Sequence, residues 1–155
     1  MLPAQALDYH ELEIGTAFTG TARTLTETDL VQFCMMTGDW HPIHADAEHA
    51  RSTRIGQRMF HGTFGIALAI SMSADLLALK QPIIAALGIR EWSFKAPLFI
   101  GDTVHVELSV RDKKTTSDGK RAVIGWQLRL LKHDGTLAQQ GISDLMISLA
   151  PQPGL

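Results

Sequence analysis

The sequence predicts an α+β protein in which an antiparallel β-sheet wraps around one central, buried α-helix, with short helices before it. The apolar run over residues 63–79 has no polar stripe wide enough for a surface helix, and a helix that is apolar on every side belongs in an interior. After Pro82 the chain shows β patterning, with the hairpin turn dipeptides Asp118-Gly119 and Asp134-Gly135. A helix followed by such a meander predicts a sheet that closes over the helix.

Length and charge limit the class of protein. At 155 residues the chain is expected to form one domain over residues 1–155, with loose termini at 1–11 and 150–155. The formal net charge is -2 and the 14 Lys and Arg residues form no basic cluster, so we expect no nucleic acid partner. The longest uncharged stretch of the helical run, residues 59–74, is shorter than the roughly 20 residues that span a bilayer, so we expect no membrane contact.

The cysteine content points to a reducing compartment. Cys34 is the only cysteine, which excludes an internal disulfide and a multi-thiolate zinc site. The N-terminus also lacks the cationic start and long apolar centre of a signal peptide, so we expect a cytoplasmic protein. Because Cys34 lies in an apolar-rich run, we interpret it as a buried hydrophobe and not as a nucleophile.

The first part of the chain is expected to form a strand and two short helices. A short strand is predicted within residues 12–24, from β-prone residues around a glycine turn. Thr26 and Asp29 are spaced as a capping box, and the helix that they begin should end at Gly38. A second short helix is permitted over residues 46–54, with Asp46 as its N-cap.

The second part reads as four strands, which we place near residues 83–96, 103–113, 121–133 and 137–149. Residues 104–110 alternate between apolar and polar side chains, as expected for a strand with one solvent-exposed face. A single sheet around one helix leaves strand edges and a second face uncovered, so we expect the protein to self-associate.

The segment between the two short helices concentrates acid–base groups. Asp39 and His44 lie on either side of Pro42, which pushes His41 toward extended geometry, so we expect a rigid non-helical loop. A carboxylate and an imidazole around one water can move a proton near neutral pH. The alternative is an ordinary solvated cap and turn.

His61-Gly62 supplies a second component at the start of the long helix. A glycine there exposes a backbone N–H where the helix dipole favours negative charge, and that N–H could stabilise an enolate or oxyanion. The alternative is that Gly62 only permits close packing.

A metal site is a further alternative for this region. The acids and histidines suffice by count for zinc or iron. Their spacing matches no helical His-x-x-x-His pair, and Pro42 interrupts them, so we expect no metal. The residues considered as ligands are Asp39, His41, His44, Asp46, His49 and His61.

The motif Gly38-Asp39-x-His41-Pro42-Ile43-His44-x-Asp46, followed by His61-Gly62 and an apolar helix, resembles the signature of MaoC-like dehydratases and (R)-specific enoyl-CoA hydratases. These are hot-dog-fold proteins. Residues 93–104 also resemble the family's strand after the helix, so the resemblance covers roughly residues 12–149.

The resemblance implies a homodimer that reversibly hydrates trans-2-enoyl thioesters in fatty acid metabolism, without a metal or redox cofactor. The CoA or acyl-carrier thioester is then the substrate itself. By position, Asp39 and His44 would hold and activate the water, and the Gly62 amide would bind the thioester carbonyl. His41 stands where the family usually has Asn, and Ile70, with Ser71 adjacent, stands where some members have Ser.

We therefore expect His41, Ile70, Ser71 and Phe94 to contact the substrate. Two other functions stay open at this point: a hot-dog acyl-CoA thioesterase, and a non-catalytic subunit that binds acyl thioesters. The pairing of Asp39 with His44 favours hydration over both.

Overall fold

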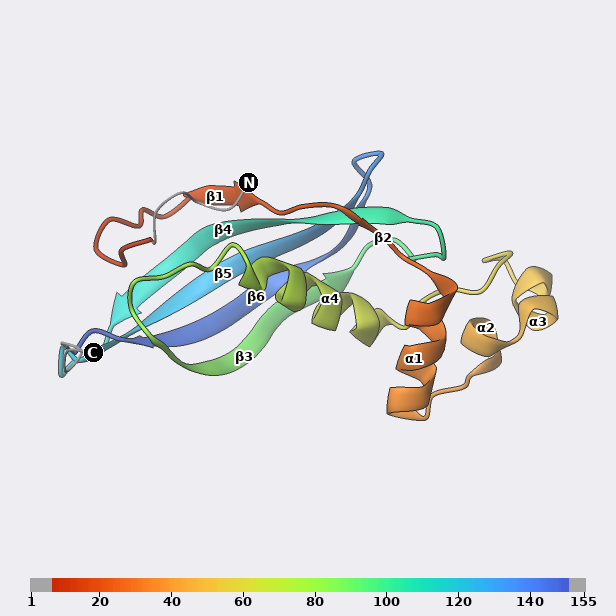
Figure 1. Ribbon diagram of the computed structural model, residues 1–155, viewed down its shortest axis with the longest axis horizontal. Coiled ribbons are helices and arrows are strands. Elements are labelled where there is room, and N and C mark those ends of the chain that lie inside the picture. Colours follow the sequence, from red (N-terminus) through yellow and green to blue (C-terminus); the bar gives the residue numbers. More distant parts are fainter. Residues whose placement is uncertain (1–6, 151–155) are drawn as a thin grey trace.

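The computed structural model describes residues 7–150, and the fold is one antiparallel sheet curved around the long helix α4 (Figure 1). Residues 1–6 and 151–155, in the predicted loose termini, lie outside the described residues. The elements in chain order are β1 (Ala17–Thr19), β2 (Arg23–Thr24), α1 (Glu27–Thr37), α2 (Pro42–Ala45), α3 (Ala47–Ser52), α4 (Gly62–Ala74), β3 (Ile83–Phe94), β4 (Thr103–Thr115), β5 (Arg121–Lys132) and β6 (Leu137–Ser148).

The strands form a sheet in the order β1-β4-β5-β6-β3, and β2 pairs with the start of β4. The pairings between these strands are antiparallel, as the meander predicted. Gly119 and Gly135 adopt φ values of 68° and 85° in the two predicted hairpin turns, a region that favours glycine. The predicted α+β class and the four long strands are therefore confirmed.

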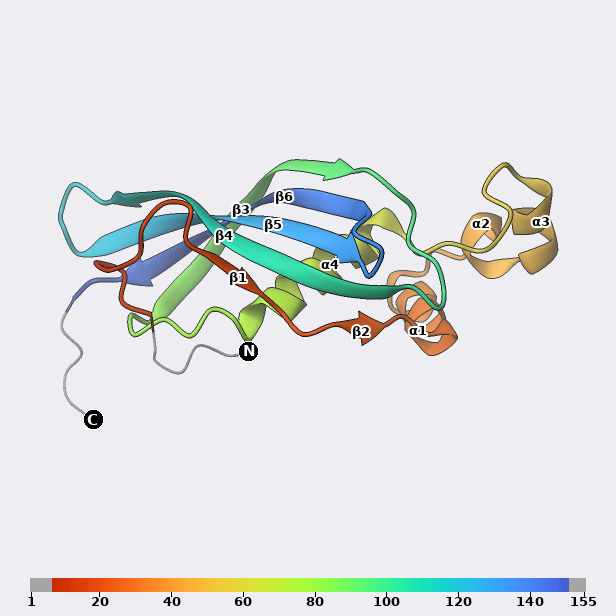
Figure 2. The ribbon, with the colours of Figure 1, turned by 90° about the horizontal axis from the view of Figure 1, so that it is seen from above.

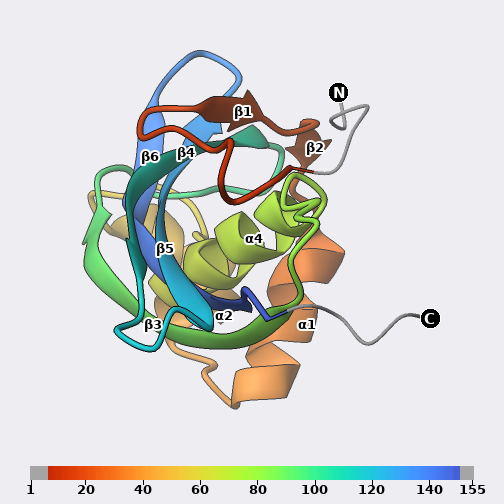
Figure 3. The same ribbon diagram turned by 90° about the vertical axis from the view of Figure 1, so that its left-hand side faces the viewer.

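The core lies between the concave face of the sheet and α4, and Figure 3 shows the sheet curving around this helix. Alternate residues of β4 point inward and are almost fully buried, among them Val104, Val106 and Leu108. From α4, Leu68 and Ala69 pack against this face. Burial of these apolar side chains stabilises the fold by about 25 cal/mol for each Å² removed from water.

The prediction of a helix to residue 79, buried on every side, was wrong in two respects. The helix ends at Ala74, and Leu76 is buried in the turn that follows. Ala67 and Ser71 are exposed, because the sheet covers only one side of α4 in the single chain. A helix with small residues on its exposed face also lacks a wide polar stripe, so the absence of a stripe did not by itself show that every face is buried.

The prediction of a loose N-terminal arm was wrong for residues 7–11. The Leu7 N–H donates to the Ala78 carbonyl at 2.6 Å, and the Lys80 N–H donates to the Leu7 carbonyl at 2.8 Å. Tyr9 is buried, and the Lys113 ammonium donates to its carbonyl at 3.0 Å. The arm is held because it pairs with the segment after α4 and buries an aromatic ring.

Helices α1, α2 and α3 lie together beyond the N-terminal end of α4 (Figure 2). Thr26 and Asp29 form the predicted capping box of α1, and Gly38 ends it with φ of 74°. Asp46 caps α3 as predicted, accepting from the N–H groups of residues 48 and 49. No helix within residues 7–150 has the length and apolar character needed to cross a membrane.

The expectation of a non-helical loop after Asp39 was wrong for one turn. His41 is extended, as the following proline requires, but Pro42 then begins the short helix α2. Proline suits the first position of a helix because its missing N–H would have no partner there, and the His41 ring caps the turn by accepting from the Ile43 N–H at 3.3 Å.

Candidate active site

Three side chains converge between the end of α1, the short helix α2 and the start of α4. Asp39 follows the C-cap of α1, His44 belongs to α2, and His61 immediately precedes α4. One carboxylate oxygen and one ring nitrogen from each histidine lie within 4.8 Å of one another. The structure thus brings together the predicted pair Asp39 and His44, and it adds His61.

Local backbone geometry positions Asp39. The left-handed Gly38 turns the chain out of α1, and the Asp39 carboxylate accepts from the His41 N–H at 3.1 Å. That hydrogen bond is the main reason that the pKa of Asp39 lies below its usual range. Asp39 is therefore a carboxylate at neutral pH, and its side chain is half exposed.

His44 is held in one tautomer by a backbone carbonyl. Its Nδ1 lies 2.6 Å from the Met59 carbonyl oxygen, which can only accept, so Nδ1 carries the proton. Nε2 then has a free lone pair when the ring is neutral. Burial lowers the pKa of His44 below its ordinary value of 6.5, against the opposing effect of the Met59 hydrogen bond. His44 is therefore a neutral base at neutral pH.

His61 is a site residue that the sequence places in the His61-Gly62 motif and among the candidate metal ligands, without assigning it an acid–base role. Its ring stacks on that of His44, with centroids 3.7 Å apart. Its Nε2 lies 3.0 Å from the Asp39 backbone carbonyl and 3.6 Å from the carboxylate, so Nε2 carries the proton. Nδ1 is buried and has no hydrogen-bond partner within residues 7–150. Its position next to Gly62 was the available signal.

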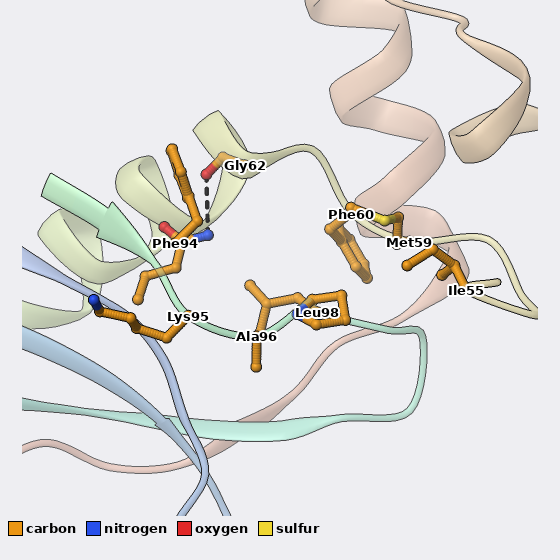
Figure 4. A pocket seen from close by; sticks show the side chains of 10 residues that line it. Ile55, Met59, Phe60, Gly62, Phe94, Lys95, Ala96 and Leu98 are labelled. Atoms are coloured by element: carbon orange, nitrogen blue, oxygen red, sulfur yellow. Dashed lines mark hydrogen bonds between the residues drawn. The ribbon is translucent and has the colours of Figure 1, made fainter.

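Gly62 begins α4 beside an apolar pocket (Figure 4). The first N–H of a helix has no intrahelical partner. The Gly62 N–H also donates to no acceptor elsewhere in residues 7–150. A Cβ on Gly62 would lie 3.0 Å from the Phe94 ring, so the ring packs closely against this residue. The pocket has a volume of about 410 Å³ and is lined by Ile55, Met59, Phe60, Gly62, Phe94, Lys95, Ala96, Pro97, Leu98 and Gln139.

The four residues predicted to contact substrate occupy different places. Phe94 lines the Gly62 pocket, whereas Ile70 lines a separate apolar pocket of about 170 Å³ between α4 and the sheet. His41 is exposed and caps α2, with its ring 6.2 Å from that of His44. Ser71 is exposed on the uncovered face of α4. Of the four, the structure therefore places only Phe94 beside Gly62.

Three of the six residues considered as metal ligands lie close together in the structure. Asp46 and His41 act as helix caps, and the His49 ring lies 6.4 Å from that of His41. Only Asp39, His44 and His61 converge within residues 7–150. To bind a metal through Nε2, His61 would have to give up its hydrogen bond to the Asp39 carbonyl. Cys34 is buried, and its burial, with a further contribution from the Asp39 carboxylate, raises the pKa of its thiol, so it stays protonated.

A sheet curved around one helix defines a hot-dog-fold domain, and an acid and two imidazoles lie together at that helix's N-terminus as a candidate acid–base site. A Mycobacterium tuberculosis protein described as a double hot-dog fold superposes with a TM-score of 0.79 at 18% identity, over 94% of this chain and 45% of that one. Residues 11–127 match the family described as MaoC like domain, and the chain belongs to this family.

Relatives of the chain include named dehydratases and hydratases. A 3-hydroxybutyryl-CoA dehydratase of Methylorubrum extorquens is 32% identical over 114 residues, covering 72% of this chain and 69% of that protein. Protein MaoC of Klebsiella aerogenes is 34% identical over 68% of this chain, which spans only 31% of that protein. The structure of an R-hydratase from Pseudomonas aeruginosa is 26% identical with a TM-score of 0.70, over 97% of this chain and 96% of that one.

Proposed function

We propose that the protein is an (R)-specific enoyl-CoA hydratase, which reversibly adds water to a trans-2-enoyl thioester to give a (3R)-3-hydroxyacyl thioester. The observation that carries the proposal is the convergence of Asp39 and His44 next to the first N–H of α4. The family and the named hydratase and dehydratase relatives support this class of reaction.

The protonation states of the pair suit the binding of one water. The Asp39 carboxylate and the free His44 nitrogen are both acceptors at neutral pH. A water has two O–H groups, so a single water can donate to both and keep a lone pair directed at the β-carbon of the substrate. As the new C–O bond forms, the water's proton passes to the pair.

The start of α4 supplies the complementary charge. When water adds to the β-carbon, the C=C electron pair moves toward the thioester carbonyl and produces an enolate. The Gly62 N–H and the helix dipole favour that negative charge, and one such donor contributes about 3 kcal/mol. The enolate then takes the proton from the pair at its α-carbon, so the addition releases no net proton.

This chemistry changes no oxidation state, and we propose that it needs no metal or redox cofactor. The substrate carries its own activating group, as a CoA or acyl-carrier thioester, and we place the protein in the cytoplasm. Chelation with EDTA is expected to leave the hydration rate unchanged, whereas a loss that zinc restores would support the metal alternative at Asp39, His44 and His61.

We further propose that the protein works as a homodimer joined along β3. This strand pairs only with β6, so one of its edges is open within residues 7–150. Ile83, Ile84, Leu87 and Ile89 of β3 are each about half exposed, between 47% and 51%. A long apolar edge of this kind is normally covered, and a second copy would cover it.

Substitution of the pair tests the proposal. Asp39→Asn and His44→Gln are each expected to lower kcat for crotonyl-CoA hydration by about 10²- to 10⁴-fold, because each removes an acid–base group. The rate is measured from the loss of enoyl-thioester absorbance. His49→Gln, an exposed change in α3, is the matched control and should retain wild-type activity.

Circular dichroism and thermal melting should show that all three variants fold as the wild type does. Near-normal hydration by either Asp39→Asn or His44→Gln would contradict the assigned roles. Release of free thiol from acyl-CoA by the wild type, without hydration of the enoyl thioester, would instead identify a thioesterase.

A further inference from the structure

Gln139 is a buried polar residue of β6 whose side chain reaches the first turn of α4. It is 3% exposed. Its Nε2 donates to the Gly62 carbonyl at 3.1 Å, and its Oε1 accepts from the Trp92 indole N–H at 3.0 Å. Figure 4 shows the bond to Gly62 at the edge of the pocket, which Gln139 also lines. Both ends of the carboxamide are therefore fixed beside the proposed carbonyl-binding N–H.

Two glycines provide the space for this arrangement. A Cβ on Gly65 would lie 2.1 Å from Gln139 Nε2, and a Cβ on Gly141 would lie 2.2 Å from Trp92 Cε3. Burying an amide costs free energy unless its polar atoms are bonded, and an apolar side chain of similar size would avoid that cost. Packing alone therefore does not explain an amide at this position.

The bond holds the first residue of α4 from a strand that is 77 positions away in the sequence. Gly62 has no Cβ, and the Phe94 ring occupies the space where one would be. The Gly62 N–H and carbonyl belong to two peptide planes that meet at its Cα, so anchoring the carbonyl also restricts the direction of the N–H. We infer that Gln139 is a positioning residue that aims the Gly62 N–H at the thioester carbonyl, an inference that rests on the proposed function.

Gln139→Met tests this inference because it keeps the length of the side chain and removes both hydrogen bonds. We expect kcat for enoyl-CoA hydration to fall about 10- to 100-fold with KM nearly unchanged, since misplacement of a group by about 1 Å costs up to about 100-fold in rate. The pH profile should keep its wild-type acid limb, because Asp39 and His44 are untouched. Gln140→Met, the next residue on the same strand and on its opposite face, is the matched control.

The Gly62 amide resonance in ¹⁵N-labelled protein gives a readout that does not depend on activity. Gln139→Met should shift it, and Gln140→Met should not. Trp92→Phe, which frees only one end of the carboxamide, should shift it less and lower kcat less, and this variant decides the matter if Gln139→Met fails to fold.

The two possible failures are distinguishable. A wild-type protein that hydrates no enoyl-CoA would contradict the proposed function, while the amide resonance would still test the position of Gly62. A Gln139→Met variant with an unshifted Gly62 resonance would overturn the inference, whatever its rate. So would a shifted resonance with wild-type kcat on an active enzyme.

Discussion

At the scale of single residues, two backbone carbonyls decide what the stacked imidazoles can do. The Met59 carbonyl places the proton of His44 on Nδ1, and the Asp39 carbonyl places that of His61 on Nε2. The rings are 3.7 Å apart, so a charge on one opposes a charge on the other. The arrangement therefore favours a neutral His44 with Nε2 free, which is the form that can accept a proton from water.

The pH dependence of hydration follows from this arrangement. His44 must be neutral to act as a base, and burial lowers its pKa below the ordinary 6.5, so kcat/KM should fall only as the pH drops below that value. Asp39 does not contribute to this limb, because the His41 hydrogen bond keeps its pKa below 3.8. The measurement is kcat/KM against pH for crotonyl-CoA. An acid limb centred above 6.5 would mean that another group titrates.

At the scale of elements, the two glycines of α4 have opposite tolerances. Gly65 faces the buried Gln139 amide, and an alanine Cβ would lie 2.1 Å from it, so Gly65→Ala should lower the free energy of unfolding by about 1–3 kcal/mol. Gly62 faces the apolar Phe94 ring, which is 59% exposed in the single chain and, unlike the Gln139 amide, is held by no side-chain hydrogen bond, so Gly62→Ala should change the free energy of unfolding by less than about 1 kcal/mol.

Urea unfolding of the two variants checks this contrast. Because the displaced Phe94 ring lines the pocket, Gly62→Ala should lose hydration activity while keeping its stability. Equal losses of stability in the two variants would mean that the Phe94 ring is as fixed as the Gln139 amide, and the contrast would be wrong.

The elements that the sequence predicts well are those with local signals. The four long strands follow from alternation and from the Asp-Gly turns, and α1 follows from its capping box. Helix α2 has only four residues, too few to show any periodicity. Which face of α4 is exposed depends on the elements that pack against the helix, and the sequence of the helix itself does not identify those elements.

The residues of the candidate site also differ in how far a local sequence signal predicts them. Asp39 and His44 are close in sequence and share a recognisable motif, so both could be predicted. Gln139 meets Gly62 across 77 positions of sequence and Trp92 across 47, and neither end carries a local pattern. Only the register of β6 against β3, together with the docking of α4, brings these three residues together.

At the scale of the whole molecule, the open edge of β3 predicts the assembly. We expect the wild type to have twice the mass of one chain by light scattering. Leu87→Lys, which places a charge among half-exposed apolar side chains of this strand, should shift it toward the monomer. Ile14→Lys is the matched control, because Ile14 is 66% exposed and precedes β1 at the opposite edge of the sheet.

The activity of the monomeric variant separates the acid–base groups from the pocket. Asp39, His44 and Gly62 come from one chain, so they stay together when the dimer dissociates. Phe94 lies on β3 itself and lines the pocket, so its position should depend on the partner. Leu87→Lys should therefore raise KM for enoyl-CoA more than it lowers kcat. A wild type that is monomeric at every concentration, or a Leu87→Lys variant as dimeric as the wild type, would show that β3 is not the interface.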